Sequence, residues 1–134
     1  MSLFPAAALA DLGRHARATY RDTVTFQANA GGRRTGEDWR DVAALSGIPA
    51  SVRQVSADEE PLAGQFVGRR VYHVRFDADP AAGVTADAVA AGMRLRVHAR
   101  AGFAARVAAL IAPAEDVGRH GRWLRVVAVD EGAV

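Results

Sequence analysis

The chain contains no cysteine, no lysine and no long hydrophobic run. Without cysteine there can be no disulfide, thiolate metal site or cysteine nucleophile. The longest apolar runs, residues 5–10 and 107–114, are far shorter than the ~20 residues that cross a bilayer as a helix. No basic residue precedes the first of these runs, so a signal peptide is not predicted. We therefore expect a soluble, intracellular protein with no membrane partner.

The missing lysine leaves 17 basic residues, all of them arginine, against 15 acidic residues and a formal net charge of +2. The codon usage of a GC-rich genome explains this bias best, because it also supplies the abundant Ala, Gly and Val. The alternative explanation is that arginine suits phosphate and interface pairing. A net charge this small is not the strong basic excess of a dedicated nucleic-acid binder. Charge alone therefore supports no binding function.

Catalytic motifs are also missing: the sequence has no nucleophile elbow, Walker loop, dinucleotide glycine pattern or zinc-protease motif. His73 and His98 lie on the polar faces of two predicted strands and could be neighbours. We expect them to be exposed, because a metal site needs further ligands and supporting partners. Glu59 and Glu60 are adjacent on a predicted loop, which does not hold carboxylates at a catalytic distance, so we expect a solvated pair. The sequence predicts no enzyme, cofactor, metal site or small-molecule substrate.

Half of the 134 residues are hydrophobic, which is enough for one domain, residues 1–134, with a real core. Residues 3–20 predict an N-terminal helix. Its apolar positions share one face at helical spacing: Leu9, Leu12, Ala16 and Tyr20. We expect that face to dock on a sheet or on a neighbouring subunit.

The rest of the chain predicts short strands separated by turns that contain Gly and Pro. The predicted strands are 23–27, 39–45, 48–53, 71–76, 93–98, 106–112 and 123–129. Residues 106–112 also fit a helix, and 85–91 predict a single helical turn. We expect Trp39 to be the largest anchor of the early core, and the last strand to be central because it is apolar on both faces. The fold class is mostly β: a small six- or seven-stranded antiparallel barrel or sandwich with the N-terminal helix packed on it.

Residues 54–70 form a long polar connection between two central strands. Compact hairpins close in ~2–5 residues, and longer loops are usually functional or disordered. We predict that this loop is a gating or docking segment that meets a partner, and that it is separable from the core. The residues expected to serve it are Gln54, Glu59, Glu60, Pro61, Gly64, Phe66 and Gly68.

The loop ends on Arg69 and Arg70, and a second arginine pair, Arg33 and Arg34, lies at the tip of an earlier Gly-rich turn. We predict that these four residues face DNA or a partner carboxylate. A purely solubilising role is equally consistent with them, since charge runs are usually solvated faces.

Six short segments follow one another in a distinctive order: DTVTFQ at 22–27, GEDWRDVA at 36–43, IPASVR at 48–53, YHVRF at 72–76, GMRLRV at 92–97 and WLRVVAV at 123–129. In this order the chain resembles the phage head-tail connector family, the head-completion or stopper proteins of siphophage-like particles. The resemblance covers most of residues 20–130.

This resemblance implies a virion assembly protein that forms a ring, usually of twelve copies, beneath the portal and adaptor of a capsid. The ring closes the DNA-filled head and docks the tail, and the long loop lines or plugs the channel through which double-stranded DNA passes. Implied partners are other copies of the chain, portal or adaptor proteins and tail proteins. The implied location is the host cytoplasm during assembly of a phage or prophage particle, and then the head-tail joint of the virion.

Two alternatives stay open. One is a tail-terminator-type ring protein of the same particle. The other is a nucleic-acid-binding β-barrel module, which requires stacking aromatic residues on an exposed face together with basic residues. Tyr72 and Phe76 share an apolar face with Val74, so we expect them to be buried, which argues against that module.

Overall fold

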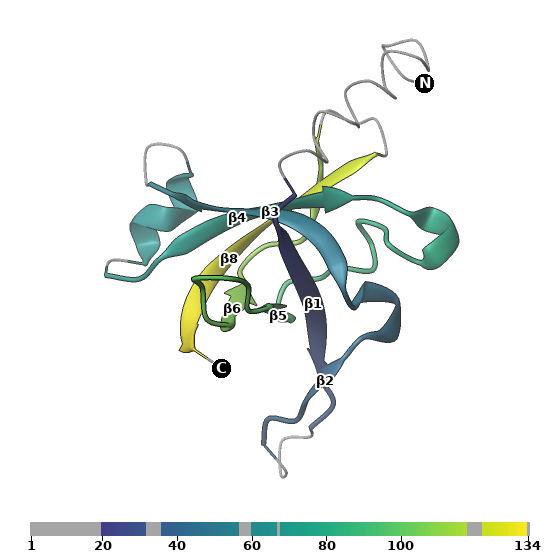
Figure 1. Cartoon of the computed structure of the whole chain (residues 1–134), viewed down its shortest axis with the longest axis horizontal. Coiled ribbons are helices and arrows are strands. Elements are labelled where there is room, and N and C mark those ends of the chain that lie inside the picture. The colour runs from purple at the N-terminus through teal and green to yellow at the C-terminus, as the bar shows by residue number, and fades with distance from the viewer. Residues whose placement is uncertain (1–19, 32–35, 57–59, 67, 118–121, 134) are drawn as a thin grey trace.

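The computed structural model describes residues 20–31, 36–56, 60–66, 68–117 and 122–133. The predicted helix at 3–20 lies outside these residues, apart from Tyr20. The described chain is mostly β and forms a closed antiparallel barrel of six strands with two short extra strands (Figure 1), which confirms the predicted fold class. The barrel strands are β1 (Asp22–Asn29), β3 (Ile48–Val55), β4 (Val71–Asp77), β5 (Arg94–Val97), β6 (Arg106–Leu110) and β8 (Trp123–Ala133). None of the described helices is long and apolar enough to cross a bilayer.

The strands follow one another around the barrel in the order β1-β3-β4-β8-β6-β5, and β5 pairs with β1 to close it. The longest strand, β8, has 11 residues and pairs with β4 on one side and β6 on the other. Its predicted central position is therefore confirmed. The extra strands are short: β2 (Trp39–Asp41) pairs with β1, and β7 (Glu115–Asp116) pairs with β8.

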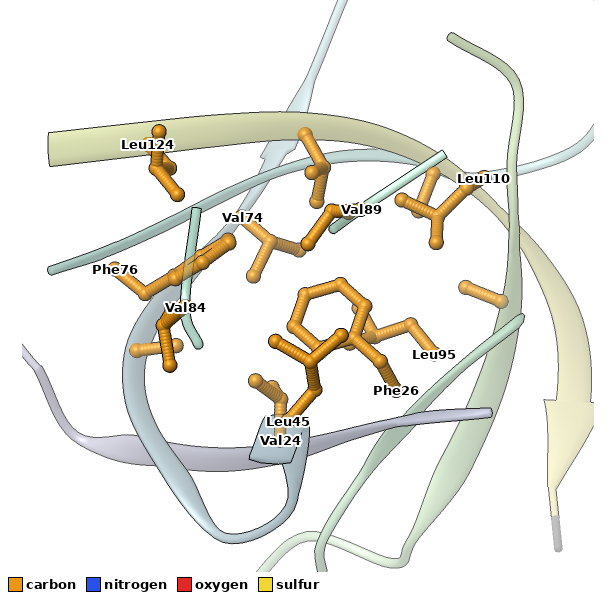
Figure 2. Packing of buried hydrophobic residues seen from close by; sticks show 14 residues of the cluster. Val24, Phe26, Leu45, Val74, Phe76, Val84, Val89, Leu95, Leu110 and Leu124 are labelled. Carbon is orange, nitrogen blue, oxygen red and sulfur yellow. The ribbon is translucent and has the colours of Figure 1, made fainter. Parts of the chain in front are cut away.

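Every second residue of each barrel strand points inward, as the pleat of a strand requires. The rings of Phe26 and Phe76 meet at the centre, with centroids 5.3 Å apart. Figure 2 shows the buried cluster around them, which consists of Val24, Phe26, Leu45, Ala50, Val74, Phe76, Val84, Val89, Leu95, Ala108, Leu110, Leu124, Val126 and Ala128. The alternation in the sequence of β4 and β5 thus correctly predicted which face is inside.

One end of the barrel is closed by residues that do not belong to its strands. Leu45 comes from a short 3-10 turn, η1 (Ala43–Leu45), and Val84 and Val89 come from the connection between β4 and β5, which begins with η3 (Pro80–Ala82). All three side chains pack into the main core (Figure 2). This is the end at which β4 stops and β5 starts. The cavity described below lies at the opposite end, which is called the open end.

Three local predictions were wrong. The predicted strand 39–45 stops at Asp41, because the chain bends at Val42 into η1 to place Leu45 in the core. Trp39 is only half-buried and lies outside the core, with the guanidinium carbon of Arg94 4.9 Å from its ring centroid. Residues 85–91 form hydrogen-bonded turns instead of a helical turn.

The segment 106–112, which fitted both a strand and a helix, contains β6 at Arg106–Leu110. The long connection begins later than predicted. Gln54 and Val55 still belong to β3, where they pair with Tyr72 and Val71 of β4. The connection is therefore residues 56–70, called the 56–70 loop below, and it contains a 3-10 segment, η2 (Pro61–Gln65).

Candidate functional site

The 56–70 loop packs against the outside of the barrel. Side chains of β3, β4 and β8 that alternate with the core residues point outward, and here they form a second buried apolar cluster. This outer cluster consists of Val55, Val71, Val127 and Val129, with Ala63, Phe66 and Ile111 packed on it. Because Ala63 and Phe66 belong to the loop, removing apolar surface from water holds the loop on the barrel.

A polar pair lies on the same outer face of β4. The Nε2 atom of His73 is 3.0 Å from Oε2 of Glu60, and the two side chains are only 10% and 15% exposed. Polar groups with so little access to water need a partner, and here each supplies the other. The prediction of an exposed His73 and a solvated Glu60 was therefore wrong. The loop covers a strand face that the sequence pattern indicated to be open.

The backbone of the loop is also organised. The amide of Glu60 donates to the carbonyl of Ser56 at 2.9 Å, and the amide of Arg69 donates to the carbonyl of Phe66 at 3.1 Å. Gly68 has φ +81°, a left-handed conformation that other residues rarely adopt. Pro61 and Gly64 are exposed in η2. The described part of the loop is thus held on the barrel of its own chain, through side chains that pack on the outer cluster. Its docking on a partner stays a prediction.

The predicted arginine pair lies where the loop returns to the barrel. Nη2 of Arg69 donates to the carbonyl oxygen of Asp130 at 2.9 Å, and the carbonyl of Arg70 accepts from the amide of Asp130 at 2.9 Å. Both arginines are exposed. The other predicted site residues, Arg33, Arg34 and Glu59, lie outside the described residues.

The open end of the barrel, called the barrel mouth below, lies beside Arg70. Here β1, β4 and β6 begin and β3 and β5 end. It contains a cavity of about 220 Å³. Val52, Val97 and Ala108 form apolar walls, and Gln54 and Tyr72 also line the cavity. Gln54 is therefore part of the mouth and not of the loop.

An ion pair lies at the mouth. The guanidinium of Arg106 donates twice to the carboxylate of Asp130, from Nε to Oδ1 at 3.0 Å and from Nη2 to Oδ2 at 2.5 Å. These hydrogen bonds lower the pKa of Asp130 from its ordinary value of 3.8, against the opposing effect of burial. They also raise the pKa of Arg106. Asp130 and Arg106 are thus joined by two hydrogen bonds, and Tyr72 lines the cavity beside Arg106.

Further basic and aromatic groups complete the rim of the mouth. Nε of Arg100 donates to Oδ1 of Asp22 at 2.8 Å, and its guanidinium carbon lies 4.3 Å from the ring centroid of Phe103. Phe103 is 61% exposed and is the exposed large hydrophobic residue within the described parts of the chain. His98 also lines the cavity, with Nε2 2.7 Å from Oγ1 of Thr25.

His73 and His98 are not brought together, because β4 and β5 are not neighbours in the barrel and each histidine has a different partner. Tyr72, expected to be buried, is half-buried at the mouth. The sequence prediction missed Arg106 and Asp130. One signal could have found them: Arg106 lies two residues before Ala108 and Asp130 two residues after Ala128, so both continue the inward face of their strands.

Within the ranges that the structure describes, no group of three or more His, Asp or Glu side chains could hold a metal ion. Comparison with protein-family models and with curated proteins finds no match for this sequence. A hypothesis about function must therefore be argued from the resemblance in the order of its segments and from the two sites described above.

Proposed function

We propose that the chain is a ring-forming head-tail connector of a phage-like particle, a stopper that closes the DNA-filled capsid and docks the tail. The observation that carries this proposal is the 56–70 loop, which is docked on a closed barrel and ends on two exposed arginines, Arg69 and Arg70. The proposed class of function comes from the resemblance of the chain to the connector family in the order of its sequence segments.

The barrel suits a ring subunit for a geometric reason. A ring of identical subunits needs two different complementary surfaces on each copy. The loop covers the β3–β4–β8 side, whereas β2 projects from the β1 side (Figure 1). The first residue of β2 is Trp39, whose ring is covered by the guanidinium of Arg94. These are chemically different surfaces on different sides of a small domain. We infer that neighbouring copies meet through them.

The exposed arginines suit a channel through which DNA passes. Guanidinium groups bind phosphates without reading the base sequence, which is what a passage for any packaged genome requires. One copy offers few such groups, since the net charge of the whole chain is only +2. A ring repeats them in every copy, so a useful positive lining arises only on assembly.

The proposal is tested in the genome that encodes the chain. After deletion of the gene, electron microscopy of the induced particles should show DNA-containing or leaking heads without tails, together with free tails of normal length. The intact gene supplied in trans should restore joined particles, and the variant R69Q/R70Q should restore fewer. Joined particles in normal numbers without the gene would overturn the proposal. Free tails of irregular length would favour the tail-terminator alternative.

A further inference from the structure

The cavity at the barrel mouth has the size of a single small ligand. Its volume is about 220 Å³, whereas sites for drug-sized molecules occupy roughly 300–1,000 Å³. The walls are apolar where Val52, Val97 and Ala108 face inward. An alkyl or aryl group that enters would therefore leave water for a preformed apolar surface.

The rim of the same cavity carries more positive than negative charge. Three arginine residues line it: Arg70, Arg100 and Arg106. Two carboxylates oppose them, because Asp22 pairs with Arg100 and Asp130 pairs with Arg106. The group of Arg70 is left in excess, so the mouth favours one negative charge.

Hydrogen-bond donors are also in excess at this site. A guanidinium has five N–H bonds and no acceptor. Arg106 directs Nε and Nη2 at Asp130, and Arg100 directs Nε at Asp22. Other N–H groups of both residues therefore stay available to an incoming oxygen. The exposed side chain of Arg70 adds further donors.

A ligand that suits both the apolar walls and the positively charged rim of the cavity has a single negative charge on an apolar body. A carboxylate meets this description, and its two oxygens match the fork of a guanidinium. Inorganic phosphate offers the charge but no apolar body, and an alcohol offers the body but no charge. We propose that the barrel mouth binds an organic carboxylate with an alkyl or aryl body, either a free small acid or the C-terminal residue of a peptide.

The experiment uses the ¹⁵N-labelled full chain and follows its amide resonances during titration with hexanoate. We expect saturable shifts, at millimolar ligand, centred on the amides of Tyr72, Val97 and Phe103. Hexanol and inorganic phosphate serve as controls that carry only one of the two features and should bind at least about tenfold more weakly. Absence of saturable shifts with hexanoate, or equal shifts with hexanol, would overturn the proposal.

Two peptides distinguish the sources of the carboxylate. Both end in Leu, one with a free carboxylate and the other amidated. Tighter binding of the free peptide than of hexanoate, and loss of binding on amidation, would assign the site to chain termini. Binding of hexanoate with no saturable shift from either peptide would assign it to free small acids.

Variants of the chain test whether hexanoate binds at the barrel mouth. R70Q should weaken hexanoate binding about tenfold, the loss expected for a hydrogen bond to a charged group. R40Q is the matched control, since Arg40 is an exposed arginine on β2 that pairs with Asp38 away from the mouth. V97F fills the cavity without a change of charge and should abolish binding while the rest of the spectrum is preserved. Equal weakening by R40Q and R70Q, or unchanged binding in V97F, would overturn the assignment to the mouth.

Discussion

Asp130 contacts both the end of the 56–70 loop and Arg106 at the open end of the barrel. Its carboxylate pairs with Arg106, its carbonyl accepts from Arg69, and its amide donates to the carbonyl of Arg70. The backbone contacts tie the end of the 56–70 loop to β8, while the side chain neutralises an arginine at the mouth. One residue therefore connects the docked loop with the proposed ligand site.

The lowered pKa of Asp130 makes the stability of the fold depend on pH. A carboxyl whose pKa is lower in the folded chain stabilises it above the ordinary value of 3.8 and loses that contribution as the pH falls through the folded value. We expect D130N to unfold at lower urea concentration than the wild type at pH 7. The difference in urea midpoint between D130N and the wild type should shrink when both proteins are measured below pH 3.8. A difference that stays constant across this range would contradict the assignment.

The control for this measurement is D38N. Asp38 forms an ion pair with Arg40 in which both side chains are well exposed, at 46% and 72%. Exposed pairs contribute only about 0–1 kcal/mol. We therefore expect D38N to shift the urea midpoint little at either pH, so that a large shift in D130N reports its own surroundings.

The Glu60–His73 pair has little access to water, so removal of Glu60 takes away the hydrogen-bond partner of the Nε2 atom of His73. We expect E60A to lower the free energy of unfolding by about 1–3 kcal/mol, measured by urea denaturation. The double variant E60A/H73A should lose less than the sum of the single variants, because the two groups depend on each other. Additive losses would show that the pair does not interact.

A matched control for E60A is E37A. Glu37 is exposed and accepts a hydrogen bond from Nε1 of Trp39 at 3.1 Å. Surface substitutions of this kind usually change stability by less than about 0.5 kcal/mol. A loss in E37A equal to that in E60A would mean that the reduced exposure of the Glu60–His73 pair has no energetic consequence.

At the scale of elements, the 56–70 loop should open more easily than the barrel. Phe66 supplies the largest side chain that the loop packs on the outer cluster. We expect F66A to weaken docking by about 1–2 kcal/mol, since this ring is partly buried. Hydrogen exchange should then accelerate about tenfold or more at the amide of Arg69, while the amide of Val74 in β4 stays protected.

The control for F66A is Q65A, which changes the neighbouring exposed residue of η2. It should leave the exchange rate of the Arg69 amide unchanged. Equal acceleration at Val74 and Arg69 in F66A would mean that the loop and the barrel open as one unit. That outcome would contradict a docked segment with its own stability.

The docking of the loop also marks the limit of what the sequence could predict. The alternation of apolar residues in β4 indicated the correct inner face, because a period of two follows from strand geometry alone. It could not show that Val71 and His73 on the opposite face are covered, since their cover comes from residues 60–66 through tertiary contacts. Deletion of residues 54–70 would uncover this outer cluster and remove the end of β3. The expectation that the fold survives that deletion stays a prediction.

At the scale of the whole molecule, the sequence predicted a mostly β fold. It did not settle whether the sheet closes into a barrel. Short alternating strands and frequent turns indicate a barrel or a sandwich equally well. The pairing of β1 with β5, which decides between them, joins Val24 to Val97, and no local pattern specifies such a distant partner. The exposed position of Arg70 was predicted from its polar context. The mouth was not, because it is assembled from the ends of strands that are distant in the sequence.

The proposed channel role gives a prediction for DNA binding by the isolated chain. With a net charge of +2, a single copy should bind double-stranded DNA weakly and without sequence preference. Each phosphate contact adds about 0.9 to the slope of log K against log salt. Fluorescence anisotropy of labelled DNA at several salt concentrations should therefore show a slope shallower by about 2 in R69Q/R70Q, if both side chains reach phosphates.

The control, R40Q/R122Q, removes the same charge from two exposed arginines outside the loop, and it should change the slope less. Equal changes in the two double variants would mean that the attraction depends on net charge and not on the position at the end of the loop. Tight binding of single-stranded oligonucleotides by the wild-type monomer would be a different result. It would favour the nucleic-acid-binding module over the connector, because a ring subunit needs its neighbours to gather enough arginines around a duplex.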